Sequence, residues 1–195
     1  MVKAAVTRRQ TRTPDAAPHG RSAVRKLHVL TYNIHKGFSQ FSARMMIHEL
    51  RRRLHGLNPD IVLLQGVLGL HERHAERRHD WPEGGQHDFI AEGVWPDTAY
   101  GGNAIYDHGH HGNAILSRFP ILASHNQDIS ESRFERRGML HTELAVPGWK
   151  EPLHCVCVHL GLTAAARRRQ MLALAERMEE VSPGETPLII AGDFN

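Results

Sequence analysis

The segment Pro187-Leu-Ile-Ile-Ala-Gly-Asp-Phe-Asn195 indicates the fold class of this chain. An apolar run of strand type is followed by a carboxylate and an amide, Asp193 and Asn195, which are two residues apart and therefore share one face. Sites in α/β proteins are built at strand ends, because the sheet holds the backbone while its edge stays open to water. We therefore expect an α/β protein with a polar site at this edge.

Two further strand candidates end in polar side chains of a complementary kind. Leu27-His-Val-Leu-Thr-Tyr-Asn33 ends in an amide, and Cys157-Val-His159 ends in an imidazole. A carboxylate with amide oxygens suits Mg²⁺, and a nearby imidazole supplies phosphate contact or proton transfer. Each residue alone reads as a turn residue, since Asn and Asp are common after strands. Their joint occurrence predicts a site.

Short apolar runs alternate with helical stretches from Leu27 onward, which predicts one α/β domain. Expected strands are Leu27–Ile34, Asp60–Val67, Asn113–Ser117, Met139–Val146, Leu153–His159 and Pro187–Ala191. The segment between Leu70 and Tyr100 is rich in His, Arg, Gly and Pro, and we expect it to be a long excursion, that is, a connection outside the sheet.

Two helices are predicted from periodicity and capping residues. The first runs from Ser42, a candidate N-cap, to Gly56, and the second follows Thr163 and ends near Val181. The apolar faces expected for them are Met46, Leu50 and Leu54 in the first, and Met171, Leu174 and Met178 in the second.

Length and composition fit a single globular domain. The chain has 195 residues, of which 41% are hydrophobic and 23% charged. It lacks both the ~18-residue apolar stretch of a membrane span and the apolar block of a secretory signal. Cys155 and Cys157 are expected to be buried reduced thiols on one face of a strand. These features predict a soluble, cytoplasmic protein with no membrane span.

The basic charge is concentrated in residues 1–26. This segment carries seven basic side chains against Asp15 alone, which leaves 17 basic and 20 acidic side chains for residues 27–195. Because it is rich in Pro, Thr, Ala and Arg without periodicity, we expect residues 1–26 to be a disordered basic tail. An organelle transit peptide is the minor alternative.

The strand-end motifs, taken together, resemble those of a known superfamily. These motifs are Thr31-Tyr-Asn33-Ile, Leu64-Gln65, Gly112-Asn113-Ala-Ile-Leu-Ser-Arg118-Phe-Pro, His159-Leu160 and Gly192-Asp193-Phe-Asn195. In this order they resemble the endonuclease/exonuclease/phosphatase superfamily, which has the DNase I-like fold. The resemblance implies that residues 27–195 form a two-sheet α/β sandwich flanked by helices. It also implies cleavage of phosphoester bonds with Mg²⁺ or Mn²⁺.

The same resemblance implies roles for individual residues. Asn33 would help to hold the metal or its water. Asp193 and Asn195 would position or activate the attacking water, and His159 would contact the scissile phosphate or assist proton transfer. The pocket would be lined by Asn113 beside His110 and His111.

Two departures from the family pattern predict impaired activity. Where the family has its main metal-binding Glu, directly after Leu63-Leu64-Gln65, this chain has Gly66. The family also continues, beyond the position of Asn195, with more strands and a closing His motif. We therefore expect a C-terminally truncated member that holds the N-terminal part of the domain. Removing a catalytic group commonly lowers the rate by ~10³-fold or more.

Three functions remain open. The first is a Mg²⁺-dependent phosphodiesterase or nuclease of impaired activity, whose partner is a phosphodiester in nucleic acid or in a phospholipid head group. The second is a catalytically inactive phosphate- or nucleic-acid-binding module. The third is a metal-binding protein based on histidines. His71 and His74 would lie on one face of a helix, and His108, His110 and His111 are further candidates. No obligate protein partner is evident.

The basic runs of the folded part have two interpretations each. The preferred interpretation of Arg51–Arg53 and of Arg167–Arg169 is a solvent-facing surface of a helix. The alternative is a contact with nucleic acid. The segment Glu135-Arg136-Arg137-Gly138 is equally compatible with an arginine near an anionic substrate and with a surface ion pair.

Overall fold

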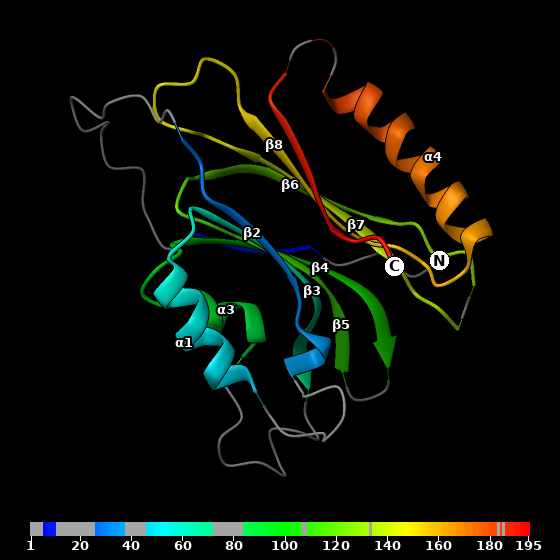
Figure 1. The fold of residues 1–195 in the computed structure, drawn as a ribbon, viewed down its shortest axis with the longest axis horizontal. Helices are drawn as coiled ribbons and strands as arrows, with labels where there is room; N and C mark the ends of the chain where they lie inside the picture. Colours follow the sequence, from blue (N-terminus) through cyan, green and yellow to red (C-terminus); the bar gives the residue numbers. More distant parts are fainter. Residues whose placement is uncertain are drawn as a thin grey trace.

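Two β-sheets packed face to face, with helices outside them, make up the fold (Figure 1). The computed structural model describes residues 6–10, 26–37, 46–71, 84–106, 109–132, 134–182, 184 and 186–195. The first sheet has the strand order β1-β4-β5-β3-β2, and the second has the order β6-β7-β8-β9. This arrangement confirms the expected two-sheet α/β sandwich.

The first sheet is formed by β1 (Val6–Gln10), β2 (Val29–Asn33), β3 (Ile61–His71), β4 (Asp97–Tyr106) and β5 (Gly109–Ser117). The second sheet is formed by β6 (Ile121–Asp128), β7 (Gly138–Leu144), β8 (Leu153–His159) and β9 (Leu188–Asp193). The described helices are α1 (Ile47–Leu57), α3 (Gln86–Ala91), α4 (Ala164–Val181) and the short 3-10 helix η1 (His35–Gly37).

The alternation of side chains along β3 explains why helices cover the first sheet. Leu63 packs with residues of the second sheet, whereas Val62 and Leu64 pack with residues of α1 and α3 on the other face. Both faces of β3 are therefore apolar, as expected for a strand between two layers. On the far side of the sandwich, α4 covers the outer face of the second sheet through Leu174 and Met178.

Both sheets contain one parallel pair. β2 runs parallel to β3 in the first sheet, and β8 runs parallel to β9 in the second. In the second pair His159 lies opposite Asp193. Because parallel strands end at the same edge, this pairing brings the predicted polar strand ends of each sheet together.

Helix α4 confirms the predicted bounds but corrects its predicted face. The side chain of Thr163 caps the helix, since its Oγ1 accepts a hydrogen bond from the Ala166 backbone N–H at 3.2 Å. Met171 is 43% exposed, and Gln170 is buried in its place. The Gln170 amide is satisfied there: Nε2 donates to the Ile129 carbonyl, and Oε1 accepts from the Gly161 N–H.

Helix α1 begins later than predicted, at Ile47 with Met46 as N-cap, while Ser42 lies outside the described residues. Leu54 is buried in the core, and Leu50 packs against it partly buried.

Several elements were not predicted. The expected excursion between Leu70 and Tyr100 contains α3 and the start of β4, and β6 follows the Arg118-Phe-Pro turn. The sequences of β4 and β6 are poor in alternating apolar residues, and their strands are stabilised by backbone pairing with neighbours on the sheet.

The expectation of disorder is wrong for part of the basic tail. Val6–Gln10 pairs with β4 in antiparallel register. The outer edge of β4 offers unpaired backbone groups, and backbone hydrogen bonding can recruit a strand without an apolar pattern. The other tail residues, apart from Lys26, lie outside the described residues.

The two cysteines confirm the predicted burial and share the core between the sheets as free thiols. Among the described helices, none combines the length and apolar character required to cross a lipid bilayer.

Candidate active site

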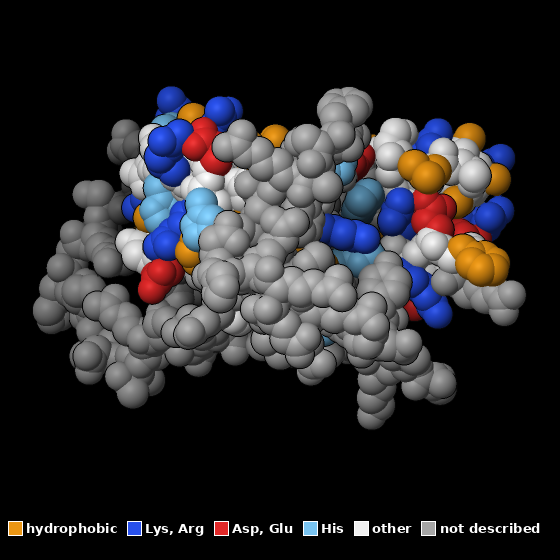
Figure 2. Space-filling model, turned by 90° about the horizontal axis from the view of Figure 1, so that it is seen from below, with side chains coloured by type: hydrophobic (Ala, Val, Ile, Leu, Met, Phe, Trp, Pro, Cys, Tyr) orange, Lys and Arg blue, Asp and Glu red, His pale blue; other side chains and the backbone are white. Residues whose placement is uncertain are grey.

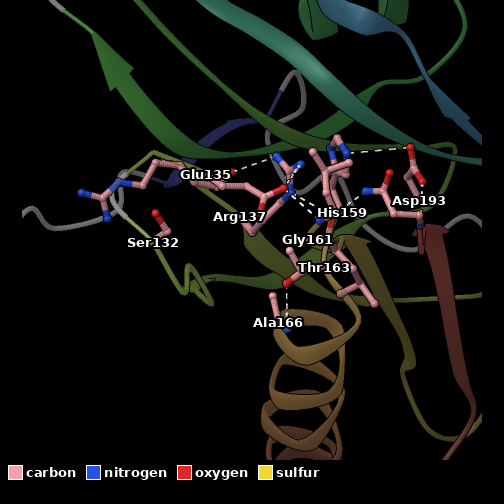
Figure 3. A network of polar contacts seen from close by, with 12 residues as sticks. Ser132, Glu135, Arg137, His159, Gly161, Thr163, Ala166 and Asp193 are labelled. Atoms are coloured by element: carbon pink, nitrogen blue, oxygen red, sulfur yellow. Dashed lines mark hydrogen bonds and ion pairs between the residues drawn. The ribbon is translucent and has the colours of Figure 1, made fainter.

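Three strand ends converge on one carboxylate oxygen. Asn33 ends β2, and its Nδ2 donates a hydrogen bond to Asp193 Oδ2 at 2.7 Å. His159 ends β8, and its Nε2 lies 3.8 Å from the same oxygen (Figure 3). Residues separated by as many as 160 positions, and carried by different sheets, therefore form one cluster.

Short turns hold these side chains in place. Asn33 Oδ1 accepts a hydrogen bond from the His35 N–H, and Asp193 Oδ1 accepts one from the Asn195 N–H, both at 3.0 Å. Asn195 in turn donates through Nδ2 to the Leu160 carbonyl at 2.6 Å. The structure therefore places Asn195 beside Asp193, with its amide nitrogen engaged by the backbone.

Asp193 is ionised at neutral pH. Burial raises its pKa, but hydrogen bonds from Asn33 and from the Asn195 N–H, together with nearby His159, outweigh that effect and hold the pKa below its ordinary value. A carboxylate in this state accepts protons only transiently and can orient a water or a cation.

His159 is neutral at the same pH. Burial, followed by the positive charge of Arg137, lowers its pKa to about 4, although the nearby Asp193 carboxylate acts in the opposite direction. The imidazole therefore enters any reaction without a charge, and it is able to accept a proton.

Arg137 lies beside the cluster, close enough for its charge to act on His159, and its side chain is only 14% exposed. Its Nη2 donates to Glu135 Oε1 and its Nε to the Leu160 carbonyl, each at 2.9 Å (Figure 3). Arg137 thus forms the ion pair with Glu135 and also lies close to the candidate site. Sequence reasoning left these two possibilities equal, because the local segment contains no signal for the direction of the side chain.

Of the predicted pocket residues, His111 and Asn113 lie toward the cluster. The pKa of His111 is lowered to about 4 by burial and then by the charges of Lys36 and Arg137, which places the imidazole within reach of their field. His110 points to the other face of β5, where its Nδ1 is 2.9 Å from Tyr100 Oη. The expectation that His110 lines the same pocket is therefore wrong, because adjacent strand residues face opposite sides.

Asn113 connects the two sheets next to the cluster. Its Nδ2 donates to the carbonyls of Gly138 on β7 and Cys157 on β8, at 2.8 and 3.2 Å. Its Oδ1 is buried and has no hydrogen-bond partner within the described residues. Asn113 thus joins the two sheets, and its second polar atom is a buried acceptor without a partner among the described residues.

Gly66 lies in a bulge of β3 between Leu64 and Val67. Its φ is +65°, and a Cβ atom built there would lie 3.0 Å from Asn33 Oδ1 and 3.4 Å from the His35 N. A side chain at this position would therefore begin beside Asn33 Oδ1. A Glu there could bind the same metal ion as this oxygen. The positive φ also means that only glycine adopts this backbone without strain.

Asn33 and Asp193 supply oxygen ligands of the kind that Mg²⁺ takes. Asn33 Oδ1 and the Asp193 carboxylate are hard oxygen ligands, and Mg²⁺ commonly takes one or two carboxylates while it keeps several waters. With glycine at position 66, the remaining coordination positions would have to be filled by water.

The structure places one residue of the predicted helical histidine pair, and it lies on a strand. His71 ends β3 rather than lying on a helix, and His74 and His108 lie outside the described residues. The group of possible metal ligands that the described part does contain is His141, Glu143 and His154, which no sequence motif indicated.

Comparison with known proteins identifies the family of this chain. The profile of the Endonuclease/Exonuclease/phosphatase family matches residues 30–195. The protein YbhP of Escherichia coli (strain K12) is 46% identical over 167 residues, a match that covers 86% of this chain and 66% of YbhP. This chain thus spans slightly less than two thirds of the length of that relative.

Solved structures show the same fold at low sequence identity. An endonuclease/exonuclease/phosphatase from Beutenbergia cavernae has a TM-score of 0.67 and 20% identity, with 87% of this chain and 47% of that chain covered. A mannosyl-6-phosphatase from Bacteroides thetaiotaomicron has a TM-score of 0.63 and 19% identity, with coverages of 87% and 66%. On the family match and the shared DNase I-like sandwich, this chain belongs to the endonuclease/exonuclease/phosphatase family.

Proposed function

We propose that the protein is a Mg²⁺- or Mn²⁺-dependent phosphoester hydrolase whose activity is weakened by Gly66. The substrate class we assign is a phosphodiester, in nucleic acid or in a phospholipid head group. The observation that carries the proposal is the convergence of Asn33, His159 and Asp193 at the ends of β2, β8 and β9.

The charge state of each residue supports a separate role. Asp193 is ionised and orients the attacking water, and the Asn195 N–H holds that carboxylate in place. His159 is neutral, so it accepts a proton or donates a hydrogen bond to a phosphoryl oxygen. Arg137 adds a fixed positive charge beside His159, which favours an anionic substrate.

A divalent ion would be held by Asn33 and Asp193. When bound, it supplies stabilisation of the negative charge that grows on the phosphoryl oxygens. His111 and the free acceptor of Asn113 are the candidates for contacts to the rest of the substrate.

The proposal is tested by hydrolysis of bis-p-nitrophenyl phosphate in titrations with Mg²⁺ and Mn²⁺. We expect slow, metal-dependent turnover, which Asp193→Asn lowers by ~10²-fold or more because a catalytic group is lost. Asp60→Asn is the matched control, since Asp60 accepts a backbone hydrogen bond from His28 in another part of the molecule. Equal rates for the two variants would contradict the proposal, and rates typical of family members that have Glu at this position would contradict the weakening by Gly66.

The inactive binding module is the second candidate, and the observation that favours it is again Gly66. A salt-sensitive complex with DNA or RNA but no hydrolysis would support it. The arginines of α1 give this candidate limited support, because carboxylates offset their positive charge. Arg51 pairs with Glu92, and both Arg52 and Arg53 pair with Glu49. In the view of Figure 2, basic side chains lie among acidic ones over the described part of the visible surface.

A further inference from the structure

A second cluster of possible metal ligands lies in the second sheet, apart from the candidate active site. His141 and Glu143 are on β7 and His154 is on β8, and one ligand atom of each lies within 4.8 Å of the others. His154 and His159 are five positions apart on β8, or about 17 Å along the strand, and they point to opposite faces. The cluster therefore cannot share an ion with Asp193.

The strand register assembles this cluster. Glu143 lies directly opposite His154, and His141 is opposite Val156, one diagonal step from His154 on the same face. This is the outer face of the sheet, on which Val156 packs with residues of α4. His141 Nε2 and His154 Nδ1 are 2.9 Å apart, and the two rings are stacked.

The two histidines of this cluster are buried, and the glutamate is partly exposed. His141 and His154 are only 4% and 5% exposed, whereas Glu143 is half-buried. Burial, and then His154 and Arg177, lower the pKa of His141 to about 4, so its imidazole is in the neutral form that binds metals. Arg177 of α4 and His125 of β6 are the further basic groups that act on it, and Glu143 supplies the carboxylate of the group opposite His154.

We propose that His141, Glu143 and His154 form a binding site for Zn²⁺ or a similar late first-row divalent ion. Two imidazole nitrogens and a carboxylate are a ligand set that zinc accepts, whereas Mg²⁺ prefers oxygen alone. Water or His125 completes the coordination, since His125 is in register with His141 on the adjacent strand. The site joins β7 to β8, and through His125 it also reaches β6.

The simpler reading is a hydrogen-bonded histidine pair without an ion, and metal binding to the full chain distinguishes the two. Zn²⁺ is titrated calorimetrically into metal-free protein with excess Mg²⁺ present, and thermal unfolding is recorded alongside. We expect one Zn²⁺ per chain and a higher melting temperature. Glu143→Gln should weaken binding at least tenfold, and His154→Asn should abolish it.

The controls locate the ion. His71→Asn/His74→Asn and Asp193→Asn should bind Zn²⁺ as the unmodified chain does, because these positions belong to the histidine pair suggested by the sequence and to the candidate active site. Co²⁺ should give the visible d–d bands of tetrahedral coordination, and these bands should be lost in Glu143→Gln. Gln has the size of Glu, so this variant decides the matter even if His154→Asn does not fold.

The proposal is overturned by any of three results. These are the lack of stoichiometric Zn²⁺ binding to the unmodified chain, unchanged affinity in Glu143→Gln and His154→Asn, and loss of binding in one of the control variants instead.

Discussion

Gly66 shows how one residue links backbone conformation to chemistry. Its φ of +65° in the β3 bulge suits glycine, and its missing side chain removes the second carboxylate that a Glu would place near Asn33 Oδ1. A Glu introduced there would gain a position beside a possible metal but would adopt a left-handed backbone, which costs roughly 1–3 kcal/mol. Metal affinity and stability therefore respond in opposite directions at this position.

Two substitutions separate these effects. We expect Gly66→Glu and Gly66→Ala to lower the free energy of unfolding alike in the absence of metal, since both introduce a Cβ atom into the same backbone. Only Gly66→Glu should raise Mg²⁺ affinity. Urea unfolding in EDTA and Mg²⁺ titration measure the two quantities, and a gain in affinity for Gly66→Ala would contradict the role assigned to the carboxylate.

His159 is the residue whose charge should report phosphate binding. Its pKa of about 4 reflects burial and the positive charge of Arg137. A phosphate anion beside the ring would stabilise the imidazolium, so inorganic phosphate should raise this pKa. Titration of the imidazole by NMR, with and without phosphate, checks the direction. The same titration with chloride at matched ionic strength is the control, and a pKa that phosphate leaves unchanged would place the anion elsewhere.

At the scale of elements, α4 shows where helical periodicity is informative and where it is not. Its buried side chains are spaced by four residues: Ala166, Gln170, Leu174 and Met178. The oxygen and the nitrogen of the Gln170 amide each form a hydrogen bond inside the protein. An apolar pattern alone selects Met171, because it cannot recognise that a polar side chain is satisfied inside the core.

Alanine substitutions on α4 test this correction. Leu174→Ala should destabilise the protein by about 2–5 kcal/mol, since it leaves a cavity against the second sheet. Met171→Ala should change the stability little, because that side chain is largely in solvent. Chemical denaturation of both variants gives the comparison, and a larger loss for Met171→Ala would contradict the orientation of the helix.

At the scale of the whole molecule, buried neutral histidines predict a loss of stability in mild acid. His111, His141 and His159 each have a folded-state pKa of about 4, below the ordinary 6.5 of an unfolded histidine. The unfolded chain therefore binds more protons between these values, so stability is fully present above about pH 6.5 and falls as the pH decreases toward 4.

Urea midpoints measured from pH 8 to 4 in EDTA check this dependence. His159→Asn should flatten the curve in this window, because asparagine does not titrate. A midpoint that stays constant down to pH 4 would show that the histidines are charged as easily in the folded chain as in the unfolded one.

The sequence alone determined those features that are written in neighbouring residues. Asn33, His159 and Asp193 are candidates because each comes at the end of an apolar strand pattern. The bounds of α4 follow from Thr163 as a helix start and from the end of the helical pattern near Val181. Contiguous residues encode such features through backbone geometry and capping, which do not depend on the rest of the chain.

The tertiary structure decided everything that depends on which distant segments meet. β4 exists because its backbone pairs with β1 and β5, Arg137 lies inside because Glu135 and the Leu160 carbonyl hold it, and Glu143 meets His154 only through the register of β7 and β8. Strand register and the burial of polar groups are settled by pair contacts across the chain, and a local pattern carries no information about the partner.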